Sequence, residues 1–105
     1  MIKLLLVEDD AMLRYMIRNS LEVVIGGYEM AEAANGAEGL ELWKTFRPDI
    51  IVADVEMPVM DGISTATALK ERGSAARVLM VTTFGRPGYV QRALDAGALG
   101  FVVKD

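Results

Sequence analysis

Short apolar runs alternate along the chain with longer segments in which apolar residues recur every three or four positions. Five of the runs have the length and composition of β-strands: Lys3–Val7, Tyr28–Ala33, Ile50–Ala53, Val78–Val81 and Phe101–Val103. Four of them are almost continuously apolar, which is typical of strands buried on both faces of a parallel sheet. The run Tyr28–Ala33 alternates polar and apolar residues, so we expect it at an edge of the sheet.

Four segments with helical periodicity fill the intervals: Ala11–Val24, Ala37–Phe46, Gly62–Arg72 and Gly88–Ala96. The first carries apolar residues at the spacing of one helix face, namely Leu13, Met16, Ile17, Leu21 and Val24. Asp10, immediately before it, is a favourable N-cap. Strands alternating with helices predict an α/β fold with a mainly parallel sheet. Because crossovers are right-handed, few topologies remain, and we expect a flavodoxin-like five-stranded sheet of order 2-1-3-4-5.

Polar residues end four of the predicted strands. Glu8 and Asp9 follow the first strand, Asp54 the third, Thr82 the fourth and Lys104 the fifth. The carboxyl ends of parallel strands meet at one edge of the sheet, where open α/β folds bind their ligands. Strands 1 and 3 flank the point where the strand order reverses, so we expect Asp9 and Asp54 to face each other across a crevice.

Carboxylates gathered in this way favour a bound cation. Two of them a few ångströms apart near a surface repel by roughly 1–4 kcal/mol, and oxygen ligands with room for water suit Mg²⁺. A carboxylate such as Asp54 beside Mg²⁺ can attack phosphorus and form an acyl phosphate. Lys104 and the Thr82 hydroxyl can stabilise the phosphoryl group. A helix cap or a solvated loop explains each residue taken singly, but the combination predicts a phosphoryl-accepting aspartate site.

Composition excludes several other functions. The length of 105 residues fits one domain. The chain has no cysteine and no histidine, which excludes thiolate metal sites, cysteine nucleophiles and histidine bases. Its net charge of −4 disfavours direct binding to nucleic acid. No apolar run approaches the roughly 20 residues that cross a bilayer, and acidic residues follow the first run too soon for a secretory signal. We therefore expect a cytoplasmic protein without a membrane segment.

The ordered set of motifs resembles the receiver domain of two-component response regulators, whose fold is CheY-like. The matching segments are Val7-Glu8-Asp9-Asp10, Asp54-Val55-Glu56-Met57-Pro58, Met60-Asp61-Gly62, Thr82-Thr83 and Lys104. The resemblance covers essentially the whole chain. It is greatest to receivers of regulators with a LuxR-type output domain, the NarL/FixJ and DesR-like group.

The resemblance implies a role for each matching site residue. Asp54 is the expected phospho-acceptor. Asp9 and Asp54 are expected to bind Mg²⁺ through their carboxylates, the Glu56 backbone carbonyl to be a third ligand, and Glu8 to act through water. Lys104 is expected to pair with the phosphoryl group.

The resemblance also implies a switch and its partners. Thr82 is expected to turn inward after phosphorylation, and Phe101, where many members have tyrosine, to follow it and reshape the surface of helix 4 and strand 5. The expected phosphoryl donor is a sensor histidine kinase, and the expected readout is dimerisation that controls a DNA-binding output domain. We expect residues 1–105 to be one receiver that ends after strand 5, without a fifth helix or an output domain, and its uncovered apolar face or helix 1 to mediate self-association.

Three other functions stay open at this point. The first is an interaction module with the same fold but no phosphorylation. The second is an aspartate-nucleophile phosphatase, although such enzymes carry Asp-x-Asp after strand 1, whereas Asp54 follows strand 3. The third is a flavodoxin, although no Ser/Thr-rich phosphate loop follows strand 1. The expected protein is a signalling domain rather than an enzyme that turns over an external substrate.

Overall fold

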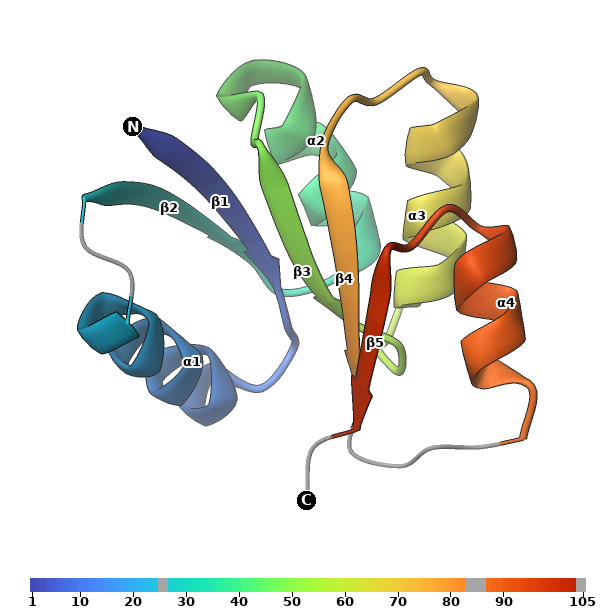
Figure 1. Ribbon diagram of the computed structural model, residues 1–105, viewed down its shortest axis with the longest axis horizontal. Helices are drawn as coiled ribbons and strands as arrows, with labels where there is room; N and C mark the ends of the chain where they lie inside the picture. The colour runs from blue at the N-terminus through green and yellow to red at the C-terminus, as the bar shows by residue number, and fades with distance from the viewer. Residues whose placement is uncertain (25–26, 83–86, 104–105) are drawn as a thin grey trace.

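A computed structural model describes residues 1–24, 27–82 and 87–103. Strands and helices alternate through this part of the chain (Figure 1). Their bounds are β1 (Ile2–Val7), α1 (Ala11–Val24), β2 (Tyr28–Ala33), α2 (Gly36–Phe46), β3 (Ile50–Asp54), α3 (Gly62–Glu71), β4 (Arg77–Thr82), α4 (Tyr89–Asp95) and β5 (Gly100–Val103). The predicted α/β class and every predicted element are confirmed.

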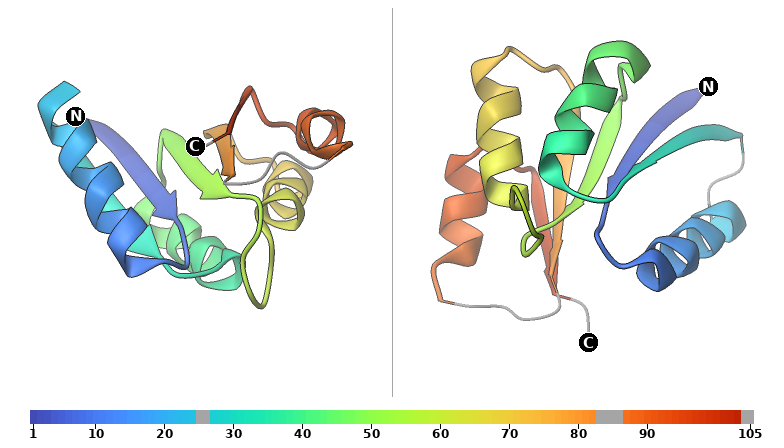
Figure 2. Two further views of the ribbon diagram at one scale, coloured as in Figure 1. Left: turned by 90° about the horizontal axis from the view of Figure 1, so that it is seen from below. Right: turned by 180° about the vertical axis from the view of Figure 1, so that it is seen from behind.

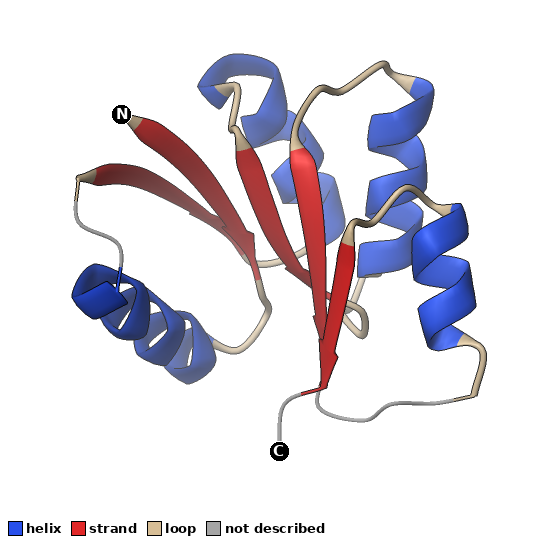
Figure 3. Ribbon diagram, in the orientation of Figure 1, coloured by secondary structure: helices blue, strands red, loops and turns tan. Residues whose placement is uncertain are grey.

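The strands form one parallel sheet in the order β2-β1-β3-β4-β5, as predicted. At its centre, Val7 at the end of β1 pairs with Ala33 of β2 on one side and with Ala53 of β3 on the other. Asp54, the last residue of β3, pairs with Val81 of β4. All five arrowheads point to the same edge of the sheet (Figure 3), so the residues that follow β1, β3 and β4 lie close together there.

The main hydrophobic core lies between the sheet and α2, α3 and α4, which cover one face (Figure 2). Alternate residues of the central strands enter it, among them Val7, Ile51, Ala53 and Met80, each at most 1% exposed. Burial is continuous in β1, from Leu4 to Val7, whereas β3 and β4 alternate buried residues with half-buried ones, so the predicted burial on both faces holds fully for β1 alone.

Helix α1 lies apart from the other three helices, beside β1 and β2 (Figure 2). Asp10 caps it as predicted, because its Oδ1 accepts hydrogen bonds from the backbone N–H groups of Met12 at 2.8 Å and Leu13 at 3.2 Å. The predicted apolar face is only partly covered: Leu13 and Ile17 are half-buried, and Met16 is 55% exposed. Within the described residues, no helix combines the length and the apolar character needed to cross a bilayer.

Two differences from the predictions concern β5 and α4. Strand β5 is not buried on both faces, because it pairs only with β4 and forms the second edge of the sheet; Val102 and Val103 are 49% and 46% exposed. Helix α4 begins at Tyr89 instead of Gly88, because Gly88 has a φ of +84°, which no residue of a right-handed helix adopts.

Candidate functional site

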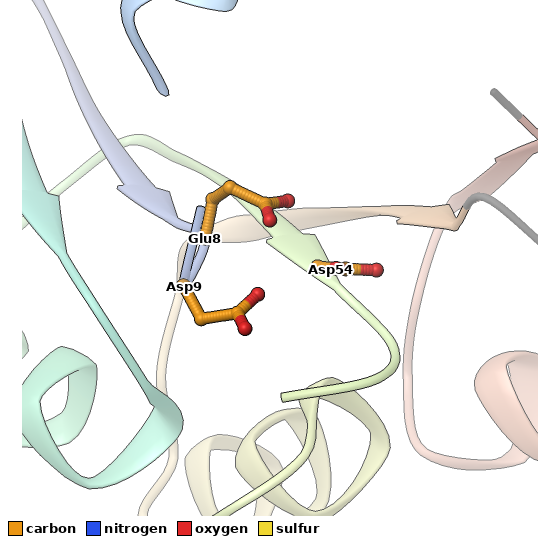
Figure 4. Close-up of side chains that lie close together, drawn as sticks. All are labelled: Glu8, Asp9 and Asp54. Carbon is orange, nitrogen blue, oxygen red and sulfur yellow. The ribbon is translucent and has the colours of Figure 1, made fainter. Parts of the chain in front are cut away.

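Three carboxylates meet at the carboxyl edge of the sheet. Glu8 and Asp9 directly follow β1, and Asp54 ends the neighbouring strand β3. Each contributes an oxygen to a group of atoms that all lie within 4.8 Å of one another. Figure 4 shows the three side chains directed to the same side of the loops that carry them. The two strands that flank the reversal of strand order therefore bring Asp9 and Asp54 together, as the topology predicts.

The carboxylates differ in exposure. Glu8 is 2% and Asp54 8% exposed, whereas Asp9 lies open to solvent. Backbone N–H groups donate hydrogen bonds to both buried carboxylates. The Asp10 N–H donates to Glu8 Oε1 at 3.2 Å, and the Glu56 N–H donates to Asp54 Oδ1 at 3.4 Å. Burial of carboxylates so near one another is costly unless opposite charge compensates it. The three convergent carboxylate oxygens are ligands of the kind that Mg²⁺ prefers, and the exposed Asp9 leaves the cluster open to solvent on one side.

The loop after β3 returns very close to Asp54. The Val55 N–H donates to the Val81 carbonyl at 3.1 Å, and the Gly62 N–H donates to the Val55 carbonyl at 2.9 Å. A Cβ atom on Gly62 would lie 2.1 Å from the Asp54 backbone oxygen, a distance that no side chain tolerates. Glycine at position 62 therefore permits the close turn that holds the end of β3 in place.

Thr82 and Phe101 lie on the strands next to the cluster. Thr82 ends β4, one residue beyond the partner of Asp54, and is 1% exposed. Phe101 of β5 pairs with Met80 and packs, half-buried, against the core. Their predicted switch roles stay predictions. Lys104, predicted to pair with the phosphoryl group, lies outside the described residues, as does Thr83.

Two side chains near the cluster were not predicted. Arg14 Nη1 donates to the Glu8 backbone carbonyl at 2.6 Å. The sequence holds a signal for this contact, because a side chain in the first turns of a helix points back toward its N-terminus. The Tyr89 hydroxyl donates to Glu56 Oε1 at 3.1 Å. No sequence pattern indicates that pair, because Tyr89 comes from the start of α4, on a different connection from the loop that carries Glu56.

The comparison of sequences decides the family. The profile of the response regulator receiver domain matches residues 4–105, nearly the whole chain. The chain belongs to the response regulator receiver domain family. The flavodoxin and phosphatase alternatives are thereby set aside, whereas an interaction module on the same fold remains compatible with the match.

Curated relatives include both transcriptional regulators and chemotaxis proteins. The chain is 38% identical to the transcriptional regulatory protein YvfU of Bacillus subtilis over 105 residues, covering 100% of the chain and 52% of YvfU. It is 40% identical to the chemotaxis protein CheY of the same organism over 103 residues, covering 97% of the chain and 84% of CheY. The receiver therefore spans about half the length of YvfU, but most of CheY.

Solved structures confirm the fold of this receiver. A LuxR-family DNA-binding response regulator from Staphylococcus aureus superposes with a TM-score of 0.91 at 29% identity, covering 98% of this chain and 86% of that one. The response regulator TrrA of Thermotoga maritima, solved in complex with Mg²⁺ and BeF, superposes with a TM-score of 0.87 at 27% identity, covering 100% and 88%. The predicted CheY-like fold, and the similarity to LuxR-type receivers, are confirmed.

Proposed function

We propose that this receiver accepts a phosphoryl group on Asp54 from a phosphohistidine of a sensor histidine kinase. The convergence of Glu8, Asp9 and Asp54 is the observation that carries the proposal. Among the three, Asp54 alone ends the strand at the centre of the sheet, beside Thr82 at the end of β4. Since the 105 residues contain no histidine, the donor lies outside this sequence.

The donor atoms of the site fit Mg²⁺. The cluster offers carboxylate oxygens only, and such ligands with space for water are those that Mg²⁺ prefers. Asp9 and Asp54 would hold the ion through their carboxylates, the Glu56 carbonyl would be a third ligand, and Glu8 would act through water. When bound, Mg²⁺ neutralises the excess negative charge and attracts the oxygens of the incoming phosphoryl group. The Mg²⁺ and BeF complex of TrrA supports this assignment by similarity.

The transfer is a single displacement at phosphorus. A carboxylate oxygen of Asp54 forms the new P–O bond, while the P–N bond of the phosphohistidine breaks and its electron pair stays on the imidazole nitrogen. Lys104 pairs with the phosphoryl charge, and the Thr82 hydroxyl donates a hydrogen bond to it. Hydrolysis reverses the modification: water attacks phosphorus, the P–O bond breaks and the Asp54 carboxylate is restored.

The new dianionic group then changes the surface of α4 and β5. Thr82 turns toward the phosphoryl group and Phe101 follows, so that a local charge biases a two-state element. Exposed apolar residues on these elements, Val90 and Leu94 of α4 and Val102 of β5, support their use in protein contacts. The proposed outcome, in the cytoplasm, is dimerisation that controls DNA binding by an output domain such as LuxR-type regulators carry.

Labelling by a small phosphodonor tests the acceptor. With acetyl phosphate and Mg²⁺, the wild-type protein is expected to incorporate phosphate and Asp54→Asn to incorporate none, because the amide is a far weaker nucleophile. Asp49→Asn, directly before the amino end of the same strand β3, is the matched control and should be labelled like the wild type. Normal labelling of D54N would refute the assignment, and an unlabelled wild-type protein would favour the phosphorylation-independent module.

A further inference from the structure

The backbone of Glu8 is fixed at both of its polar groups. Its N–H donates to the carbonyl of Ala33 on β2 at 3.0 Å. Its carbonyl accepts from Arg14 Nη1 on α1 at 2.6 Å, the short distance typical of a charge-assisted hydrogen bond. The segment that carries the two acids is therefore tied to a strand on one side and to a helix on the other.

Arg14 also forms an ion pair with Glu32 on β2. Its Nε lies 3.4 Å from Glu32 Oε1 on β2, and Arg18 Nη1 lies 2.5 Å from the other oxygen of Glu32. The side chains of Arg14 and Glu32 are only 22% and 27% exposed, so solvent screens their ion pair incompletely. Glu32 thus pairs with two arginines, and of these Arg14 also donates to the Glu8 carbonyl.

The contact with the Glu8 carbonyl has a consequence for Asp9. The peptide group that joins Glu8 to Asp9 is planar, so a fixed carbonyl direction also fixes the N–H and Cα positions of Asp9. Arg14 thereby limits the directions open to the Asp9 side chain, whose direction is then set by rotation about the Asp9 N–Cα bond alone. Asp9 is the exposed member of the acidic cluster, and a side chain in solvent has few other restraints.

We propose that Arg14 is a positioning residue for the cation site: it holds the Glu8–Asp9 peptide so that the Asp9 carboxylate faces Asp54. The inference rests on the proposed function, which makes this cluster the Mg²⁺ site. A guanidinium presents several donors in a rigid plane and can bond the Glu8 carbonyl and Glu32 together, whereas a lysine ammonium on a flexible stem cannot reproduce both directions.

The charge of Arg14 and its geometry act in opposite directions. A positive charge beside the cluster opposes cation binding, so an effect of charge alone predicts tighter Mg²⁺ binding when Arg14 is neutralised. Positioning predicts weaker binding. Replacement by lysine keeps the charge and removes the fork, and it therefore isolates the geometric contribution.

The experiment compares Arg14→Lys with Arg18→Lys. Both variants conserve charge, lie on α1 and alter an ion pair with Glu32, but only the first loses the contact with Glu8. Calorimetric titration with MgCl₂ is expected to give R14K a Kd about tenfold above that of the wild type, as for other residues that orient metal ligands. For R18K, the change should stay within about twofold, as for a partly exposed ion pair.

A metal-free measurement accompanies the titration. The Asp10 N–H donates to Glu8 Oε1, so amide hydrogen exchange at Asp10 reports the order of this segment. R14K should exchange faster there than R18K. If R14K proves unfolded by circular dichroism, Arg14→Gln replaces it, and weaker binding by this neutral variant would support positioning against charge.

The outcomes separate the two proposals. Equal Mg²⁺ affinity of R14K and R18K, or tighter binding by R14Q, overturns the role of Arg14 while the metal site stands. A wild-type protein that binds no Mg²⁺ overturns the metal site of the proposed function, and the role of Arg14 with it.

Discussion

At the scale of single residues, Gly62 sets how closely the loop after β3 can approach the acceptor. It is the first residue of α3. A Cβ atom added to it would lie only 2.1 Å from the backbone oxygen of Asp54. The Ser64 N–H donates a hydrogen bond to Asp61 Oδ1, which caps the same helix. The turn after β3 and the start of α3 are therefore held together. A side chain at position 62 must move this unit away from the end of β3.

We therefore predict that Gly62→Ala lowers the free energy of unfolding by about 1–3 kcal/mol, the usual cost of forced overpacking. The sign opposes helix propensity, since alanine is favoured over glycine in helices by about 1 kcal/mol. Urea denaturation followed by circular dichroism measures the change. Ser64→Ala, at an exposed position of the same helix, should stay within about 0.5 kcal/mol of the wild type. Unchanged stability of G62A would contradict the close approach.

The sequence allowed some site residues to be predicted and not others. Glu8, Asp9 and Asp54 could be predicted because each ends or follows a strand, and strand order alone determines which strand ends are neighbours. The pair of Tyr89 with Glu56 could not, because it depends on the path of a connection and on a rotamer. Arg14 is an intermediate case. Its position on α1 was predictable, but its hydrogen bond to the Glu8 carbonyl depends on the backbone conformation at the end of β1.

At the scale of elements, caps decided where helices begin. Helix α2 starts one residue earlier than predicted, because Asn35 has an extended backbone, with φ −159° and ψ 173°, and accepts a hydrogen bond from Glu38 N–H at 2.9 Å. Strand bounds followed the apolar pattern within about two residues, the usual uncertainty at element ends. The burial of β5 was overestimated because it was inferred from the apolar run alone, although the predicted strand order already places this strand at an edge of the sheet.

The Asn35 cap leads to a prediction for α2. Asn35→Ala removes the acceptor for the Glu38 N–H and should destabilise the protein by about 1 kcal/mol. Asn35→Asp keeps the acceptor and places negative charge at the positive end of the helix, so it should retain wild-type stability or exceed it. Thermal denaturation of the three proteins distinguishes these results, and equal midpoints for N35A and the wild type would show that the cap contributes nothing.

At the scale of the whole molecule, the two faces of the sheet are covered unequally. Helices α2, α3 and α4 bury one face, while residues on the other, such as Leu79, Val81 and Val102, keep partial exposure. An apolar hollow of about 220 Å³ lies at the amino ends of the central strands, lined in part by Leu79 and Leu99. Met16 of α1 is also exposed. Apolar surface of this extent commonly marks an interface.

We predict that the protein forms dimers at high concentration and that beryllofluoride with Mg²⁺ increases the dimer fraction. Light scattering coupled to size-exclusion chromatography measures the mass. Val102→Asp on the uncovered face and Met16→Glu on α1 place charge on the two candidate surfaces, and the variant that remains monomeric identifies the interface. Thr45→Glu, at an exposed position of α2 on the opposite face, is the control. A wild-type protein that stays monomeric with and without the phosphate analogue would contradict the prediction.

The parallel arrangement also separates the two edges of the sheet. The acidic cluster lies at the carboxyl edge, whereas the connection between α3 and β4 turns at the amino edge, where Ala75 is exposed. Because the chain has no cysteine of its own, Ala75→Cys creates a single thiol for a fluorophore or spin label. A probe attached there can report molecular tumbling, or the distance between two molecules, without contacting the acidic cluster at the carboxyl ends of the strands.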